Sequence, residues 1–358
     1  MLAADVSHPR FAASGEFHRD LKARVDAWFR ASQRSERDAP AMYLKTALIL
    51  AWFAASWALL VFGAGSVLVA AIGAASLGLA IAAVGMSVMH DANHGSYSRR
   101  AWVNGVFGWT VDALGASSYV WKVKHNAVHH TWTNIGGEDD DLDMGLLARL
   151  SPEQASRPWH RFQHLYVWVL YGLLMPKWVL YDDFANLAHG RIGQHALQRP
   201  NRRQWLLLVA GKLTFFGWAI VVPALFHPLW LVVLAAFATL FVTGVTLAVT
   251  FQLAHCVEEA TFPLAPASGR MSSDWAEHQL ETTVDFARGN PLLTWFMGGL
   301  NFQVEHHLFP KVCHVHYPAL ARIVEATARD HGLRYRATRS LHAAVRSHFR
   351  VLRRLAVA

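Results

Sequence analysis

Cysteine and charge are both scarce in this chain of 358 residues. The two cysteines, Cys256 and Cys313, are too few for a haem-attachment motif, an iron–sulfur cluster or a disulfide framework, so any electrons that the protein uses must come from elsewhere. Charged residues make up 16% of the sequence against 53% hydrophobic residues, with 15 Trp and 20 Phe. This balance is too apolar and too aromatic for an ordinary soluble domain, and it indicates a membrane protein.

Two long stretches lack charge almost completely. No Asp, Glu, Lys or Arg occurs from Thr46 to Met89, and as one helix this run would be roughly 65 Å long, about twice the thickness of a hydrocarbon core. Residues 213–254 repeat the pattern. We therefore expect an all-α integral membrane protein with about four transmembrane helices in two hairpins, at about 43–62, 66–89, 205–226 and 229–252.

Lys and Arg are absent from both expected hairpin turns and abundant elsewhere. Because basic residues near short loops are retained in the cytoplasm, both termini and a helical cap are predicted on the cytoplasmic side of the membrane. The expected parts are a cytoplasmic amino-terminal segment, a membrane domain with its cap, and a basic tail, at residues 1–42, 43–330 (cap 90–204 and 255–330) and 331–358. The net charge of +8 favours membrane lipids and acidic partners, and no nucleic-acid module is present.

Histidine is concentrated in three clusters: His90 with His94, His125 with His129 and His130, and His306 with His307. Residues three or four apart share one face of a helix, and His90 and His94 have this spacing. In the second cluster the first two also have it, and His130 points about 100° away around the helix. In the third, Gln303 lies three and four residues before the pair, and His255 directly follows the second apolar run.

The spacing favours metal ligands over isolated surface or core histidines, since neutral imidazole is the commonest nitrogen ligand for iron, copper and zinc. A tight pair with an offset neighbour suits two adjacent metals. The expected topology also returns every cluster to the cytoplasmic end of the helices. The sequence therefore predicts a single metal site there.

Three segments resemble the histidine boxes of the membrane fatty acid desaturases: HDANHGSYS from His90, HNAVHHTWTN from His125 and QVEHHLFP from Gln303. Their order and the intervening helix pairs match as well, and the similarity runs from Gly85 to Leu320. Within the family the chain is similar to the bacterial and cyanobacterial acyl-lipid or linoleoyl-type branch, also called front-end or Δ6-like, since Gln303 opens the third box where other branches have His.

The resemblance implies O2-dependent insertion of a cis double bond into a fatty acyl chain at a centre of two iron ions. Carried over residue by residue, the ligands are His90, His94, His125, His129, His130, His255, His306 and His307. Gln303 departs from the pattern: it either binds the metal, binds through water, or only donates a hydrogen bond. The acyl group is carried by a lipid, coenzyme A or a carrier protein.

No fused cytochrome b5 domain fits before the first apolar run, so an external carrier such as ferredoxin, with its reductase, is expected to supply electrons. Acidic side chains beside the boxes are candidates to orient the ligands, above all Asp91, Glu305 and Asp141. Two alternatives remain at this stage. A related di-iron hydroxylase of lipids or alkanes would share the boxes, and a metal-binding or transport protein would place histidines within the spans.

Overall fold

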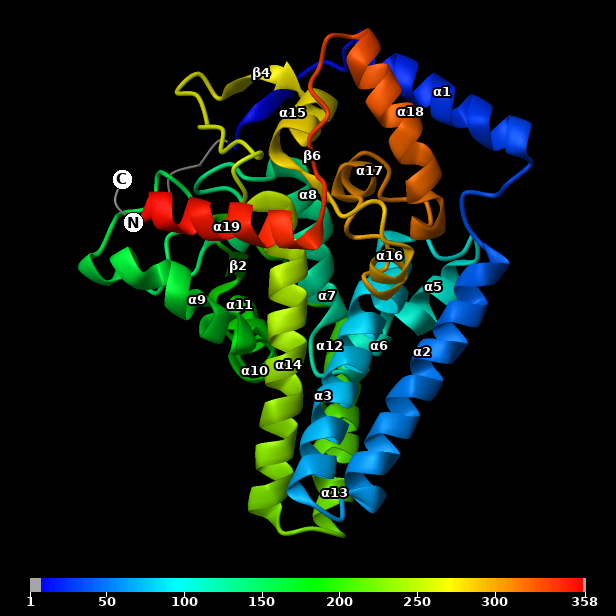
Figure 1. The fold of residues 1–358 in the computed structure, drawn as a ribbon, viewed down its shortest axis with the longest axis vertical. Helices are drawn as coiled ribbons and strands as arrows, with labels where there is room; N and C mark the ends of the chain where they lie inside the picture. The colour runs from blue at the N-terminus through cyan, green and yellow to red at the C-terminus, as the bar shows by residue number, and fades with distance from the viewer. Residues whose placement is uncertain (1–7, 357–358) are drawn as a thin grey trace.

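The computed structural model describes residues 8–356, so residues 1–7 of the expected amino-terminal segment and 357–358 of the expected tail lie outside it. Four helices are long and apolar enough to cross a membrane: Pro40–Gly63, Val67–His94, Arg202–Ala224 and Leu229–His255. They extend side by side from one end of the molecule, and all other elements gather at the opposite end (Figure 1). The predicted all-α integral membrane fold with two hairpins is thereby confirmed.

Three of the four spans consist of consecutive helical segments that follow one another without a break, and the fourth is a single helix. The first joins α2 (Pro40–Ala58) to η1 (Leu59–Gly63), and the second joins α3 (Val67–Ala83), η2 (Val84–Met89) and α4 (His90–His94). The third joins α12 (Arg202–Phe216), η7 (Gly217–Val221) and α13 (Val222–Ala224), and the fourth is α14 (Leu229–His255). Residues 64–66 and 225–228 are the short connections at the end far from the cap.

Helices α3 and α14 form the centre of the bundle. A Cβ on Gly78 of α3 would lie 2.7 Å from the carbonyl oxygen of Thr239 on α14, so only glycine permits this approach. Thr243 Oγ1 donates a hydrogen bond to the carbonyl oxygen of Gly78 at 3.0 Å. Small residues and hydroxyl donors are the usual means of joining helices in lipid, where burial of apolar surface gives no driving force.

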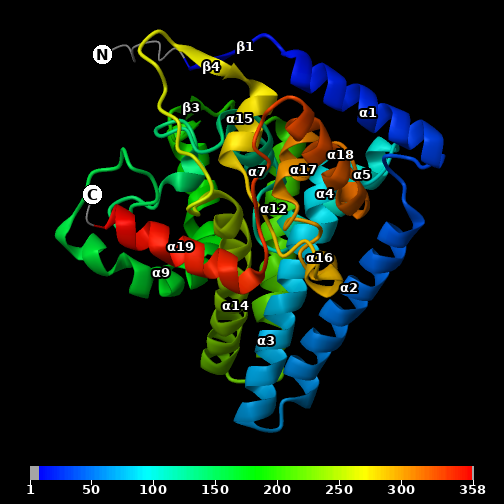
Figure 2. The same cartoon turned by 45° about the horizontal axis from the view of Figure 1, so that its top comes forward.

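The cap contains many short elements and three two-stranded sheets, two of which join segments far apart in the sequence. Strand β1 (Arg10–Ala12) pairs with β4 (Arg270–Asp274), β2 (Arg191–Ile192) with β3 (His195–Ala196), and β5 (Asp285–Phe286) with β6 (Ala337–Thr338). Helices α1 (Glu16–Ser32) and α18 (Tyr317–Asp330) pack together above α15 (Trp275–Thr282) and α17 (Gln303–Leu308), as Figure 2 shows. The chain before the first span and the chain after the last therefore share one core.

Between the second and third spans the helices are short: α5 (Ala101–Gly108), α6 (Thr110–Ala113), α7 (Ser118–Trp121), η3 (Lys122–His129), α8 (His130–Trp132), η4 (Asp140–Leu142), η5 (Pro158–Phe162), α9 (Gln163–Gly172), α10 (Leu174–Lys177), η6 (Trp178–Asp182) and α11 (Asp183–His189). Helices α9 and α10 pack against α14 and expose apolar side chains such as Leu165 and Val169. Exposed apolar residues on short helices beside a membrane bundle are typical of segments at the headgroup level.

The segment expected as a basic tail is folded onto the cap. After β6 it forms α19 (Leu341–Leu355), which buries one face and exposes its arginines. Gln163 of α9 donates to the carbonyl oxygen of Leu352 at 2.8 Å, and Glu258 accepts from Arg350 and Arg354. The remaining elements, α16 (Pro291–Phe296) and η8 (His314–His316), flank α17 in sequence.

Candidate metal centre

All eight predicted histidines converge at the cap end of the bundle. Four elements carry them: α4, the continuous η3–α8 segment, the last residue of α14, and α17. Seven of the side chains are buried and His94 is half-buried. Because α4 continues α3 and His255 ends α14, the two central helices bring His90, His94 and His255 to the same end of the bundle.

The ligand nitrogens fall into two groups. In the first group, those of His90, His94, His125 and His306 all lie within 4.8 Å of one another. The closest pair is His90 Nε2 and His125 Nε2, 3.2 Å apart. Four converging imidazole nitrogens are enough to hold one transition-metal ion.

The second group consists of His129, His255 and His307, whose ligand nitrogens are again within 4.8 Å of one another. Gln303 joins it, since its Nε2 lies 3.0 Å from His255 Nε2 and 3.3 Å from His307 Nε2. Turning the amide by half a turn would bring Oε1, which is buried and has no hydrogen-bond partner among the described residues, to the same place. The geometry is therefore compatible with ligation by Gln303 and with hydrogen bonding alone.

His130 connects the two groups. Its Nε2 lies 3.2 Å from His125 Nε2, and its ring stacks on that of His307 with 4.2 Å between centroids. The groups are thus neighbours, as a centre of two adjacent metals requires.

The local helix differs from the sequence-based expectation at the second cluster. Lys122–His129 is a π-helix, in which residues five apart lie above one another. His125 therefore meets His130, five residues later, and His129 turns to the second group. An α-helix would have put His125 and His129 on one ligand face and His130 on another.

The donor set fits a metal pair. His94 Nε2, His130 Nδ1 and His306 Nε2 are buried without a hydrogen-bond partner among residues 8–356, and such atoms are costly unless something binds them. Burial first, and then the neighbouring imidazoles, hold the pKa of His125, His130, His306 and His307 well below the ordinary value for histidine. Neutral rings offer the lone pair that a metal needs.

His129 has a carboxylate behind it. Burial alone would lower the pKa of His129, but Asp139 and, more weakly, Asp141 outweigh it, so the pKa is raised. Its Nδ1 lies 3.0 Å from Asp139 Oδ2 and 3.5 Å from Asp141 Oδ2. Asp139 also accepts hydrogen bonds from two backbone N–H groups, those of Asn134 and Asp141. The carboxylate in hydrogen-bond contact with this ring is therefore Asp139.

Three other rings have partners at Nδ1 that leave Nε2 facing the centre. His307 Nδ1 lies 2.8 Å from Gln279 Oε1 and His306 Nδ1 lies 3.3 Å from Tyr317 Oη. His255 Nδ1 lies 3.4 Å from a backbone carbonyl oxygen. Partners of this kind fix the tautomer and orientation of metal-ligating imidazoles. Gln279 and Tyr317 are in no histidine box, so no local spacing in the sequence points to them.

Asp91 and Glu305 have hydrogen-bond partners other than the eight histidines of the centre. Asp91 Oδ2 is 2.9 Å from Nδ1 of His314, whose Nε2 is 2.8 Å from the buried Lys45 Nζ of α2. Its other oxygen is 3.9 Å from His90 Nδ1. Glu305 accepts from Tyr335 Oη at 3.0 Å, and no hydrogen bond joins it to a histidine within the described part of the chain. Asp91 thus links α4 to α2, and Glu305 links α17 to the segment before β6.

Asn134 holds the loop after the second cluster in place. It is one of the few non-glycine residues with a positive φ, 59°. Its side-chain amide donates to the carbonyl oxygens of His255 at 2.9 Å, Thr261 at 3.1 Å and Thr282 at 3.3 Å. One side chain therefore ties the η3–α8 segment to the end of α14 and to α15.

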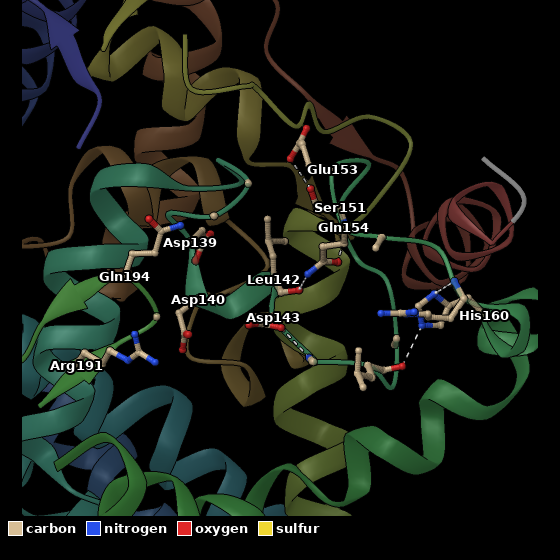
Figure 3. A pocket seen from close by; sticks show the side chains of 18 of the residues that line it. Asp139, Asp140, Leu142, Asp143, Ser151, Glu153, Gln154, His160, Arg191 and Gln194 are labelled. Carbon is tan, nitrogen blue, oxygen red and sulfur yellow. Dashed lines mark hydrogen bonds between the residues drawn. The ribbon is translucent and has the colours of Figure 1, made fainter. Parts of the chain in front are cut away.

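An open cavity of about 730 Å³ adjoins the centre on the far side of Asp139. In Figure 3 the side chains of Asp140, Arg191 and Gln194 lie on one side of it and those of Glu153, Gln154 and His160 on the other. None of the eight candidate ligand histidines is among the residues that line it. Asp139 therefore separates the buried imidazoles from a polar, solvent-facing space.

Comparison with known proteins agrees with this geometry. The sequence model of the fatty acid desaturase family matches residues 65–339. The chain is 37% identical to the sn-1 linoleoyl-lipid 6-desaturase of Arthrospira platensis, over 99% of the chain and 97% of that protein. Identity is 38% to the protein of the same name from Synechocystis sp., over 96% of each chain. With the acyl-lipid (8-3)-desaturase of Physcomitrium patens it is 35%, over 96% of the chain and 72% of that protein. The chain therefore belongs to the fatty acid desaturase family and is an integral membrane oxidoreductase that desaturates fatty acyl chains.

Proposed function

We propose that the two groups of imidazoles hold two iron ions, with His130 between them and Gln303 completing the second group directly or through water. The observation that carries this is the convergence of eight imidazoles, seven of them buried, at two adjacent sets of ligand nitrogens. Iron is preferred over zinc because zinc has no redox chemistry, whereas desaturation is an oxidation. When bound, such a pair supplies the activation of O2 and the removal of hydrogen from an unactivated methylene.

The stoichiometry requires an external reductant. Conversion of –CH2–CH2– to –CH=CH– yields two electrons and two protons, whereas reduction of O2 to two waters consumes four of each. The other two electrons must come from a one-electron carrier such as ferredoxin, re-reduced by its own reductase, and the other two protons from solvent. Both cysteines are buried and unpaired, and burial raises the pKa of the Cys256 thiol to about 12, so thiols are poor candidates for this supply.

The protein's own residues position the centre and keep water away from it. Asp139 and Gln279 hold the Nδ1 sides of His129 and His307, so that both rings present Nε2. Trp121 stacks on His125 with 4.5 Å between centroids and closes the centre on the side of α7. Rigid orientation of ligands and exclusion of water are the contributions that a protein makes to chemistry carried by its cofactor.

The proposed substrate is the acyl chain of an intact membrane lipid, with the double bond introduced at carbon 6. Two relatives that match the chain over almost their full length are named linoleoyl-lipid 6-desaturases. Gln303 at the start of the third box supports the same branch. We further propose that the cap faces the cytoplasm of a bacterial inner membrane, because both hairpin connections lack the Lys and Arg that are abundant in the cap.

Expression in a bacterium without polyunsaturated fatty acids, supplied with linoleic acid, tests the proposal. The expected product has one additional cis double bond, at carbon 6, and appears first in the membrane lipids rather than in thioesters. The His129→Ala variant should give none. A new double bond at another carbon would contradict the branch assignment, and a product that persists in the variant would contradict the ligand assignment.

Fatty acid analysis of the same cells tests the first alternative. A hydroxylated acyl chain without new unsaturation would favour a hydroxylase. A metal transporter is expected to place its histidines at mid-depth of the spanning helices. In the structure the eight histidines lie at the cap end of the spans or beyond it, which speaks against transport.

A further inference from the structure

Electrons from an external carrier must enter at a surface that is connected to the buried imidazoles. Electron tunnelling slows steeply with distance and is faster through bonded and tightly packed atoms than across gaps. The entry surface must therefore both attract a carrier protein and lead inward through contiguous side chains. One such place exists at the end of α1.

A line of rings runs from the centre to that surface. Tyr317 Oη lies 3.3 Å from Nδ1 of the ligand His306, and Tyr317 is bonded in sequence to His316. The His316 ring lies 5.3 Å from the ring of Phe29 and 6.0 Å from that of Trp28, both on α1. His306, Tyr317, His316 and Phe29 are buried, and Trp28 is half-buried. Each residue of this route is therefore linked to the next by a side-chain contact or by the polypeptide chain itself.

The surface around Trp28 is positively charged. The guanidinium of Arg34 lies 6.0 Å from the Trp28 ring, and Arg30 and Arg34 are exposed. Arg37 Nε donates to the carbonyl oxygen of Lys311 at 3.2 Å, which brings a further exposed lysine beside the same edge. We call Arg30, Arg34, Arg37 and Lys311 the basic patch.

The basic patch has an excess of positive charge that ion pairs do not neutralise, unlike several other basic positions of the cap. Among residues 8–356, none of its four side chains forms an ion pair. The carboxylates in the same segment are Glu36 and Asp38, and Asp38 accepts hydrogen bonds from Tyr43, Ser98 and the backbone N–H of Arg99. By contrast, Arg24 is paired with Asp20 and Asp330, and two arginines of α19 share Glu258. Four basic side chains against two carboxylates leave an excess of positive charge, and such an excess steers an oppositely charged partner.

We propose that the basic patch is the docking surface for a small acidic one-electron carrier protein, and that Trp28, His316 and Tyr317 conduct its electron to the histidine group that contains His306. This inference rests on the proposed function. Each encounter oxidises one reduced carrier and passes one electron inward, and two encounters supply the two electrons that each double bond requires. Such electron-transfer contacts are small and short-lived, so charge attraction governs how often they form.

Charge reversal separates docking from chemistry. In the iron-loaded full chain in lipid nanodiscs, Arg30→Glu/Arg34→Glu should lower the rate of oxidation of reduced ferredoxin about tenfold or more at low salt, and the difference should shrink as salt rises. Binding of oxidised ferredoxin should weaken in parallel. The matched control is Arg346→Glu/Arg353→Glu, two exposed arginines of α19 on another side of the cap, which should behave as the unaltered protein (Figure 1).

A second variant tests the route. Trp28→Leu should slow oxidation of the bound carrier while leaving the affinity for ferredoxin within about twofold, since the patch charge is unchanged. A chemical reductant with a small mediator bypasses docking, so all variants should form product normally in a single turnover driven this way. Where charge reversal disturbs folding, Arg30→Gln/Arg34→Gln gives the same comparison with half the change in charge.

The outcomes are distinguishable. If the unaltered protein forms no unsaturated product even with the chemical reductant, the proposed function fails. If it does form product, and the patch variants bind and oxidise ferredoxin as fast as the control variant, the docking surface is wrong while the proposed function stands. If the patch variants slow oxidation of ferredoxin but Trp28→Leu does not, electrons take another path from the same patch, which overturns the route.

Discussion

Replacement of Asp139 by asparagine tests how the second histidine group is organised. Asp139 is 4% exposed although it borders the open cavity, so water has little access to the contacts that the substitution removes. Its Oδ2 lies near His129 Nδ1 and accepts from the backbone N–H of Asn134, and its Oδ1 accepts from the backbone N–H of Asp141. Whichever way the new amide turns, its NH2 group faces a backbone donor instead of accepting from it.

The expected size follows from these contacts. Loss of the partner behind a ligating histidine lowers metal affinity or activity by about 10–100-fold, which corresponds to about 1.4–2.7 kcal/mol. A buried donor without an acceptor costs about 1–3 kcal/mol, which is the same order. We therefore expect Asp139→Asn to weaken metal binding at the second group by about one to two powers of ten, and product formation with it.

Iron bound per chain, measured against a series of chelator concentrations, gives the affinity, and product per bound iron gives the chemistry. Asp143→Asn is the matched control, because within residues 8–356 this exposed carboxylate of the same acidic run accepts one hydrogen bond, from the backbone N–H of Gly145. The thermal midpoint of the metal-free protein separates misfolding from a local effect. Iron affinity and product yield within about twofold of the control variant would refute the role assigned to Asp139.

Three further changes have definite expected results. Gln279→Leu removes the nearer partner of His307 Nδ1 and leaves only Thr133 Oγ1, at 3.3 Å, among the described residues, so iron affinity should fall about 10–100-fold, with unchanged affinity counting against this assignment. Gly298→Ala should prevent accumulation of folded protein, because its Cβ would lie 2.2 Å from the carbonyl oxygen of Met86 at a φ of +61°; normal expression in membranes would contradict this. Burial lowers the pKa of His348 to about 4, below the unfolded value of about 6.5, so its contribution to stability is complete above the unfolded pKa and is lost as pH falls toward 4. Between pH 7 and pH 5 the free energy of unfolding of the metal-free protein should therefore fall by about 2 kcal/mol more than that of the His348→Gln variant. Thermal midpoints that fall equally in the two proteins over this pH range would contradict the prediction.

The membrane fold and the identity of the ligand-bearing segments follow from local sequence. An unbroken run without charge from Thr46 to Met89 has few alternatives to a helical hairpin in lipid, because every backbone group there must be satisfied within the helix. His90 and His94 needed only the ordinary α-helical spacing, and their rings lie 4.7 Å apart. Features that depend on periodicity over one or two turns could be predicted in this way.

The division of ligands between the two groups was decided by tertiary structure. The π-helix of Lys122–His129 sends His129 to one group and His125 to the other, and α-helical periodicity predicts a different pairing. Likewise, the sequence singled out Asp141 and Glu305 beside the boxes, whereas the rings of His129 and His307 meet Asp139 and Gln279. Adjacency in sequence does not tell which face of a short helix a neighbour occupies.

Sequence alone therefore determined that the chain spans the membrane four times and carries its histidines at one end, since hydropathy and spacing are local properties. Only the folded cap decided which nitrogen faces which group and which side chain stands behind it. The physical reason is distance along the chain: Gln279 and His307 are separated by 28 residues, and Asn134 and His255 by 121. Contacts at such separations are set by how α1, α15, α17 and α18 pack together over the ends of α3 and α14.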